Sequence, residues 1–402
     1  MTSADSVFAG SPRRLFGVGL MLLAWVVTRL ALIDETFLGI TPGDVELYRS
    51  WAESLIEGGS PAIDPAFTYP PGASGLMFVI FSIAPENFYR AFTLLALAAD
   101  FTILIVLWLR SRSADTRVPM APWSWIIMGF AAGSLMYQRF DIFAALLAVL
   151  AVLTVRRSVY TGFWAGLGFV LKLWPELALL GLRSRAMPKA LIVNIATIAA
   201  FWISAQLIWG DAFGFAANAL DKGLAVESMV AFPFLLARKA GAPYQVSDLE
   251  GLYAVLGPGT DLTATLATLA GLVSILFLFV LRFLQRIDLA SPGDVVLLGL
   301  LIFIATNKFN SVQYGIWIAA ITSAALSFKE SRVRGPAILL TLMLLLTSQA
   351  VWPNFIPLTG GSPVFLAIHG LRLLLLLASL AWVVKIVVWD CRTSVRSSRL
   401  ET

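Results

Sequence analysis

Residues 262–284 read LTATLATLAGLVSILFLFVLRFL, and Arg282 is the only charged side chain among them. An α-helix needs roughly 20 mostly apolar residues to cross the hydrocarbon core of a bilayer, so this stretch predicts a spanning helix. Several other stretches share this apolar character and comparable length: residues 15–33, 88–109, 119–137, 188–209, 336–351 and 364–389. Shorter candidates are residues 141–155, 294–307 and 312–328.

The composition of the whole chain agrees with this interpretation. Hydrophobic residues make up 59% of the 402 residues and charged residues only 13%, whereas about a quarter of the residues in soluble domains are charged. A membrane β-barrel is excluded, because the apolar runs are much longer than one strand and do not alternate with polar residues. We therefore expect an all-α, polytopic membrane protein with a single domain over residues 1–402.

The basic residues indicate how the helices are threaded. Lys and Arg are enriched in the cytoplasmic loops of membrane proteins, and here they form clusters between the apolar segments. The clusters are Arg13/Arg14, Arg110/Arg112/Arg117, Arg156/Arg157, Arg183/Arg185/Lys189, Arg282/Arg286, Lys329/Arg332/Arg334 and Lys385/Arg392/Arg396/Arg399. All can be cytoplasmic if residues 72–84 are re-entrant or interfacial and residues 160–182 form a hairpin with its tip near Lys172. Ten helices then span, or about 12 if each half of the hairpin counts, and both termini are cytoplasmic.

This threading leaves two long loops, residues 34–71 and 210–261, on the non-cytoplasmic face. It also explains the net charge of +5 by topology, so we expect membrane lipids and no nucleic acid as partners. Arg13 and Arg14 precede a run long enough to span, which favours an uncleaved first helix over a secretory signal. The single cysteine, Cys391, forms no intrachain disulfide, and the chain has no Asn-x-Ser/Thr sequon. These features fit a bacterial plasma membrane.

The first outer loop carries the clearest candidate for a catalytic acid or base. Asp44 follows a Pro-Gly pair and begins an amphipathic stretch that includes Tyr48, and Tyr69 precedes two prolines. An aspartate at a helix start is also an ordinary N-cap. The alternative is a carboxylate held at the membrane surface as a general base.

Two further polar groups lie where apolar segments meet. Arg139 and Asp141 are two residues apart, and they either mark the interface or form a local ion pair that lines a site. Lys172 interrupts an apolar run, and a lysine inside a membrane is costly and usually faces a cavity or a partner. A lysine at a hairpin tip suits a phosphate.

The remaining candidates lie farther along the chain. The second outer loop contains Lys222, Glu227 and Ser228. They are either part of a site or simply polar residues of a solvated loop. Lys308, Gln313 and Tyr314 lie in a polar connection between apolar segments and suggest a site for an anion and hydroxyl groups. The only histidine, His369, lies near the outer end of the last helix, where a packed interfacial residue is the simpler interpretation. One His and one Cys make a transition-metal cluster very improbable.

The order of these pieces resembles that of the GT-C glycosyltransferases, and it is most similar to the α-mannosyltransferases of glycosyltransferase family 87. The resemblance covers about residues 29–320. The pieces in chain order are Asp44…Tyr48, Tyr69-Pro-Pro-Gly72, Arg139-x-Asp141, Lys172-x-x-Pro175, Lys222-Gly-Leu-x-x-Glu-Ser228 and Lys308-x-x-Ser-x-Gln-Tyr-x-x-Trp317.

The resemblance implies about 10–13 transmembrane helices and an active site on the non-cytoplasmic face. It implies a polyprenyl-phosphate sugar donor, most often of mannose, and an inverting transfer to a glycolipid or glycan acceptor with Asp44 as general base. We expect neither a cofactor nor a metal, because the sequence shows no obvious acidic cluster. The expected substrate-binding residues are Arg29, Tyr48, Tyr69, Arg139, Asp141, Lys172, Lys222, Glu227, Ser228, Lys308, Gln313, Tyr314 and His369.

Two alternatives remain from the sequence. The donor sugar can be arabinofuranose instead of mannose, since nothing in the sequence separates these two donors. The chain can also be a flippase or transporter of a lipid-linked substrate. A transporter predicts polar residues along the whole membrane depth, whereas here they gather on one side, which favours an enzyme.

Overall fold

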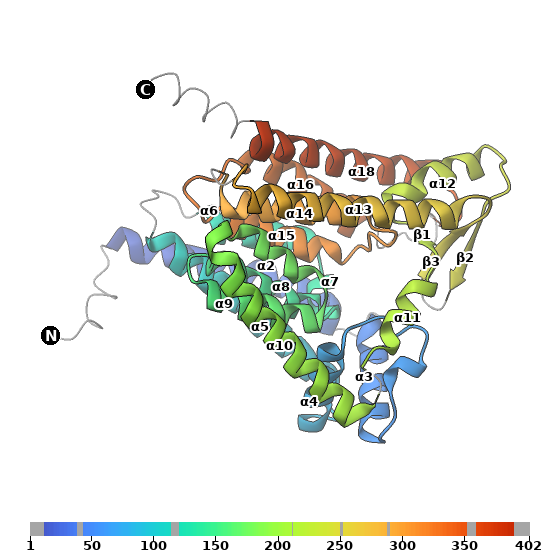
Figure 1. The fold of residues 1–402 in the computed structure, drawn as a ribbon, viewed down its shortest axis with the longest axis horizontal. Coiled ribbons are helices and arrows are strands. Elements are labelled where there is room, and N and C mark those ends of the chain that lie inside the picture. Colours follow the sequence, from blue (N-terminus) through green and yellow to red (C-terminus); the bar gives the residue numbers. More distant parts are fainter. Residues whose placement is uncertain are drawn as a thin grey trace.

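The computed structural model describes residues 12–37, 43–113, 120–210, 212–249, 252–287, 290–351 and 359–389. These residues form a bundle of helices, most of which run along one common direction (Figure 1). Several residues discussed above lie outside the described part of the chain, namely Thr41, Pro42, Arg117, Cys391, Arg392, Arg396 and Arg399.

Within these described ranges, six helical segments are long and apolar enough to cross a membrane, which confirms the expected polytopic membrane protein. Backbone groups in lipid must be satisfied within the segment, and a helix does this without any partner. The elements are α2 (Pro12–Phe37), α5 (Phe88–Ser113), η3 (Ser184–Ala186) with α10 (Met187–Trp209), α13 (Thr260–Phe283), α16 (Arg334–Leu346) with η5 (Thr347–Val351), and α18 (Pro363–Val384) with η6 (Lys385–Trp389).

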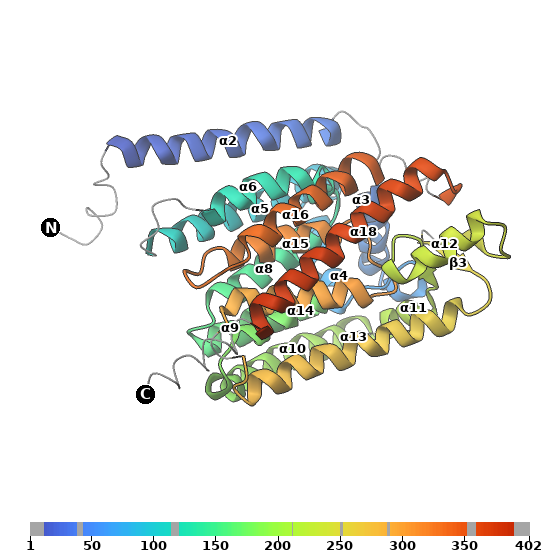
Figure 2. The same cartoon turned by 90° about the horizontal axis from the view of Figure 1, so that it is seen from above.

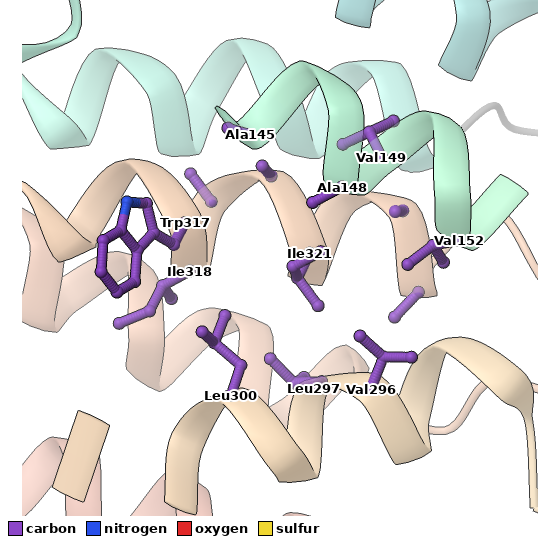
Figure 3. Close-up of a cluster of buried hydrophobic side chains, with 14 of the residues drawn as sticks. Ala145, Ala148, Val149, Val152, Val296, Leu297, Leu300, Trp317, Ile318 and Ile321 are labelled. Carbon is purple, nitrogen blue, oxygen red and sulfur yellow. The ribbon is translucent and has the colours of Figure 1, made fainter. Parts of the chain in front are cut away.

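Shorter apolar helices fill the space between these spans, and three of them form the centre of the bundle. Every residue of α15 (Tyr314–Ala325) is buried. Figure 3 shows Ile318 and Ile321 of this helix between side chains of α8 (Asp141–Leu153) and α14 (Pro292–Thr306). Small residues of α8, such as Ala148, allow the helix backbones to approach closely.

The span expected over residues 119–137 is broken in the structure. Helix α6 (Met120–Ala132) ends before Gly133, which has a positive φ of 80°, and the single turn α7 (Leu135–Gln138) follows. Glycine adopts this left-handed conformation without the steric cost that a side chain would bring. The break redirects the chain immediately before Arg139.

The hairpin expected over residues 160–182 is confirmed. Helix α9 (Ser158–Leu171) runs to the tip, and the 3-10 helix η2 (Trp174–Gly181) returns beside it. Lys172 lies at the tip with an extended backbone. The other irregular segment, α4 (Pro71–Ile83), begins at a proline pair and packs on α9, α10 and α3 (Gly43–Ile56).

The second outer loop is more ordered than the sequence indicated. It contains α11 (Gly214–Asp221), the 3-10 turn η4 (Met229–Ala231) and α12 (Phe232–Lys239). It also contains a small antiparallel sheet of order β1-β3-β2, formed by Leu224–Ala225, Leu252–Leu256 and Gln245–Leu249 respectively. Strands this short carry too little alternation to be recognised in the sequence.

The helix ends separate into two groups. Figures 1 and 2 show α3, α11, α12 and the sheet gathered at one end of the bundle, while α2 begins and α18 ends at the opposite end. Successive helices run in alternate directions, so α5, α8, η2 and α13 end at that opposite end. The basic residues that lie near these helix ends are Arg112, Arg157, Arg185 and Arg286. We call the first of these ends the loop end. Ten of the described helices end or begin there, at residues 37, 88, 132, 141, 171, 209, 260, 306, 314 and 363.

Candidate functional site at the loop end

The first outer loop reaches the centre of the loop end through one ion pair. Asp44, in the first turn of α3, binds the guanidinium of Arg139, which precedes α8. The Arg139 side chain is largely buried, whereas Asp44 is partly exposed. Burial lowers the pKa of Arg139 to about 10, and Asp141 and Glu227 act in the opposite direction. Arg139 is therefore close to carboxylates from three different segments.

Asp141 holds the tip of the hairpin. Its Oδ1 accepts hydrogen bonds from Lys172 Nζ at 2.7 Å and from Trp317 Nε1 at 2.6 Å. Its Oδ2 is buried and has no hydrogen-bond partner among the described residues. Of the two alternatives that the sequence left open for Arg139 and Asp141, the local ion pair is not the one seen, because Arg139 binds Asp44 and Asp141 binds Lys172. The backbone of Arg139 is extended between α7 and α8, so its side chain and that of Asp141 reach different partners.

Aromatic rings surround the ammonium group of Lys172. Its Nζ lies 4.9 Å from the ring centre of Trp317, 5.0 Å from Phe140, 5.3 Å from Tyr69 and 5.9 Å from Tyr314. A cation within about 6 Å of a ring face is attracted by the ring quadrupole. Together with Asp141, these rings stabilise a charge that would otherwise be costly at this depth. We call Lys172, Asp141 and the four rings the lysine cage.

Tyr48 connects the lysine cage to α3. Its ring lies 6.4 Å from Tyr69 and 5.5 Å from Phe140, both in edge-on geometry. Tyr69 in turn meets Phe140 edge-on at 4.6 Å. The first outer loop therefore contributes both a carboxylate, Asp44, and a wall of the lysine cage.

The two segments expected to be most specific lie directly against each other. Ala225 N donates to Lys308 O at 3.0 Å, and Ser228 Oγ donates to Asn307 O at 2.9 Å. Lys308 Nζ donates to the carbonyls of Leu220 and Lys222, and Lys222 Nζ donates to Leu249 O. Both lysines thus bind backbone carbonyls that hold the second outer loop in place. Gln313 lies half-buried at the N-cap of α15.

A second buried charge cluster lies beside these segments, and its central residue is Arg372 of α18. Arg372 donates to Thr347 Oγ1 at 3.0 Å and to the carbonyls of Glu227 and Asn310 at 3.3 Å. His369 is fully buried, and its Nδ1 lies 3.5 Å from Arg372. A guanidinium only donates, so Nδ1 acts as the acceptor. His369 is therefore packed inside the protein as a member of this cluster.

Glu227 lies between the two arginines. Its side chain is buried, and burial raises its pKa to about 7, although Arg372 and Arg139 act to lower it. A carboxyl with a pKa near neutrality can exchange a proton under physiological conditions. Glu227 is thus the second carboxylate at this end with properties suited to chemistry.

Arg29 has a different position from the other predicted cations. It is buried in α2, where it binds both carboxylate oxygens of Asp100 and the carbonyl of Ile126. Its guanidinium is thus committed to the interior of the bundle and is not placed with Lys172. The sequence held a signal for this pair, since Asp100 interrupts an apolar run and an acid there needs a partner.

The sequence missed several residues that complete the site. Phe140 and Trp317 belong to the lysine cage, while Arg372, Asn310 and Thr347 build the second cluster. Of these, Trp317 carried a signal, since it ends the motif that begins at Lys308, but the sequence did not indicate its role. Within the described ranges, no three His, Cys, Asp or Glu side chains are grouped so that they could hold a metal.

The geometry combines carboxylates, cations and aromatic rings on one side of a membrane bundle. The sequence profile of glycosyltransferase family 87 matches residues 67–307, which is more than half of the chain. No curated protein matches the chain significantly, and no solved structure does so either. The matched region contains Tyr69, Arg139, Asp141, Lys172 and Glu227. The chain therefore belongs to glycosyltransferase family 87 and is a membrane glycosyltransferase.

Proposed function

We propose that the protein transfers a sugar, mannose, from a polyprenyl-phosphate donor to a lipid-linked or cell-envelope glycan on the non-cytoplasmic face. The observation that carries this proposal is the ion pair of Asp44 and Arg139 beside the lysine cage. It puts a base and cations together at the end of the bundle opposite the basic clusters. Asp44 precedes the region that matches the family, so its role rests on this geometry.

The transfer step needs a base and an anion site. An acceptor hydroxyl oxygen attacks the anomeric carbon of the donor and forms the new glycosidic bond. The bond between that carbon and the phosphate oxygen breaks, and both electrons leave with the polyprenyl phosphate. The hydroxyl proton passes to the Asp44 carboxylate, which lies against the guanidinium of Arg139. Attack from the face opposite the leaving phosphate inverts the anomeric configuration.

Arg139 is the cation best placed for the leaving phosphate. It adjoins Asp44 directly, and a guanidinium presents several donors in a plane that suits phosphate oxygens. Lys172 supplies a second positive charge from the lysine cage. Fixed cations that meet a developing negative charge usually supply the largest part of catalysis. Lys222 and Lys308 support this arrangement through the backbone carbonyls that they bind.

The sugar itself has a candidate partner in Asp141. Its unpaired Oδ2 is a buried acceptor that a sugar hydroxyl would satisfy. The partly exposed ring of Tyr69 nearby can pack against the C–H groups of a sugar ring, with the buried ring of Phe140 behind it. A donor sugar bound here would have its phosphate near Arg139 and Lys172.

A direct assay tests the proposal. The full chain, purified and reconstituted in bilayers, is given radiolabelled polyprenyl-phosphate mannose or polyprenyl-phosphate arabinofuranose with a mixed lipid extract. We expect label from the mannose donor in a lipid-linked or glycan product, with inverted anomeric configuration. Transfer of arabinose alone would show that the donor sugar is arabinofuranose and not mannose. Retained anomeric configuration would refute the role of Asp44 as base. Absence of transfer from both donors would refute the proposed function.

A further inference from the structure

Asp100 lies in the middle of α5, and its carboxylate accepts hydrogen bonds from two other segments, α2 and α7. Its Oδ2 accepts from Arg29 Nε at 2.9 Å, Tyr137 Oη at 2.7 Å and Trp25 Nε1 at 3.1 Å, and its Oδ1 accepts from Arg29 at 3.1 Å. Asp100 and Arg29 are both buried. We call Asp100, Arg29 and Tyr137 the Asp100 network. A buried ion pair with this many satisfied groups fixes geometry more than it adds stability.

The Asp100 network fixes α2 to the bundle. Only 17% of the α2 span is buried inside the protein, and large side chains such as Leu23 and Leu30 are exposed. Between helices in lipid there is little hydrophobic driving force, so polar contacts and close packing set their register. The bonds from Arg29 to Asp100 and to the Ile126 carbonyl therefore fix the position of α2 against α5 and α6. The next described helix, α3, begins with Asp44 in its first turn.

The Asp100 network also fixes the turn that carries Arg139. Tyr137 belongs to α7, a four-residue helix between Gly133 and the extended Arg139. One isolated turn is unstable without tertiary contacts. The bond from Tyr137 Oη to Asp100 ties this turn to α5, and Arg139 and Asp141 follow within four residues. One buried carboxylate thus binds both α2, which precedes α3 and Asp44 in the chain, and the turn that precedes Arg139.

We propose that Asp100, through Arg29 and Tyr137, is a positioning group that sets the geometry of Asp44 against Arg139. This inference rests on the proposed role of that pair in transfer. Arg29 acts in it from within the bundle and does not touch the substrate. A direct role in substrate binding does not fit the Asp100 network, because the side chain of Arg29 is buried and binds groups of the neighbouring helices.

The first test uses Tyr137→Phe, which removes one hydroxyl and little volume. Displacement of catalytic groups by about 1 Å can cost on the order of 100-fold in rate, so we expect kcat to fall about 10- to 100-fold. The apparent KM for polyprenyl-phosphate mannose should change less than threefold, an order-of-magnitude expectation for a group that binds no donor. Tyr160→Phe removes an exposed hydroxyl near the opposite end and should leave kcat unchanged. A wild-type kcat for Tyr137→Phe would overturn the proposal.

The second test separates positioning from mere stability. The double variant Arg29→Met/Asp100→Leu replaces the ion pair by apolar groups, which proteins often tolerate, but leaves Tyr137 without its acceptor. We expect a loss of kcat at least as large as in Tyr137→Phe, because the Arg29 link is removed as well, and no further loss when Tyr137→Phe is added. A fully active double variant, or losses that simply multiply, would contradict a shared positioning role.

A third readout does not depend on transferase activity. Cysteines replace Asp44 and Arg139 in a chain in which Cys391 is serine, and a short bifunctional thiol reagent joins them. Adding Tyr137→Phe should slow cross-linking about tenfold if Arg139 is displaced, an order-of-magnitude expectation from the loss of fixed geometry. An unchanged cross-linking rate would refute the positioning role. If the wild-type enzyme transfers no sugar but cross-linking slows as expected, the proposed function fails while the positioning role stands.

Discussion

The carboxylate of Asp44 and the guanidinium of Arg139 form an ion pair that joins the start of α3 to the residue before α8. The pair brings the first outer loop against the region that matches the family. It also lies near the ion pair of Asp141 and Lys172, so positive and negative side chains alternate across the loop end. An arriving phosphate can take over Arg139 from Asp44, which would leave the carboxylate free to accept a proton.

Asp44→Asn should insert and fold but lose nearly all transfer. The amide keeps the size of the side chain and still accepts hydrogen bonds, but it cannot accept the proton. Loss of a general base typically costs 10² to 10⁴ in rate, so we expect a fall of about that size in kcat. The measurement is transfer from polyprenyl-phosphate mannose, with binding of the donor followed in parallel.

The matched control for this variant is Glu46→Gln. Glu46 lies in the same first turn of α3 and is exposed, so it should keep most of the activity. Normal transfer by Asp44→Asn together with an inactive Glu46→Gln would identify the other carboxylate as the base. Two active variants would refute a base on α3.

Lys172 and Lys308 should give different phenotypes. Removal of Lys172 alone leaves a buried carboxylate unpaired, which typically costs 3–5 kcal/mol, so the better variant is Lys172→Met/Asp141→Asn. It removes both charges while Trp317 keeps an acceptor. We expect it to fold and to use the donor at least about tenfold less efficiently, because a cation near the phosphate is lost.

Lys308→Ala should instead loosen the second outer loop. Its ammonium binds the carbonyls of Leu220 and Lys222, and loss of such bonds costs about 1 kcal/mol. The expected result is a lower Tm with a nearly unchanged apparent KM for the donor. A selective rise in that KM at normal Tm would show that Lys308 binds the phosphate.

Glu227 should make the stability of the protein depend on pH. Its pKa is raised from 4.5 to about 7 in the folded protein, so the folded state holds a proton that the unfolded state releases between these values. Stability should therefore fall as pH rises from 4.5 to 7, by up to about 3 kcal/mol.

Glu227→Gln removes this titration and should flatten the dependence of Tm on pH in that window. Glu57→Gln, at an exposed position beyond α3, serves as the control and should follow the wild type. Identical curves for wild type and Glu227→Gln would show that Glu227 does not titrate there.

The orientation in the membrane can be tested with single cysteines at exposed positions. Cysteines in place of Glu46 and Lys239 should react with an impermeant thiol reagent added to intact cells, because both lie at the loop end. Cysteines in place of Arg112 and Arg286, which lie in the basic clusters, should react only after the cells are opened. The reverse pattern would place the site on the cytoplasmic face.

The sequence by itself determined the class of fold and much of its threading. Long apolar runs such as residues 262–284 must form helices in lipid, because no water is present to satisfy the backbone. The charge of Lys172 inside such a run indicated a hairpin tip, and the structure confirmed it. The order of motifs indicated the family, which the profile match confirmed.

Only the tertiary structure decided which charges meet. Arg139 binds Asp44 and not Asp141, which was one of two alternatives from the sequence. Arg29 was expected among the substrate-binding residues but binds Asp100, and Arg372 was not singled out. The physical reason is that a spacing along the chain fixes a residue's depth and rough side in the membrane, whereas its partner depends on packing. The bend at Gly133 and the network around Asp100 direct these side chains, and both arise from contacts between segments far apart in the chain.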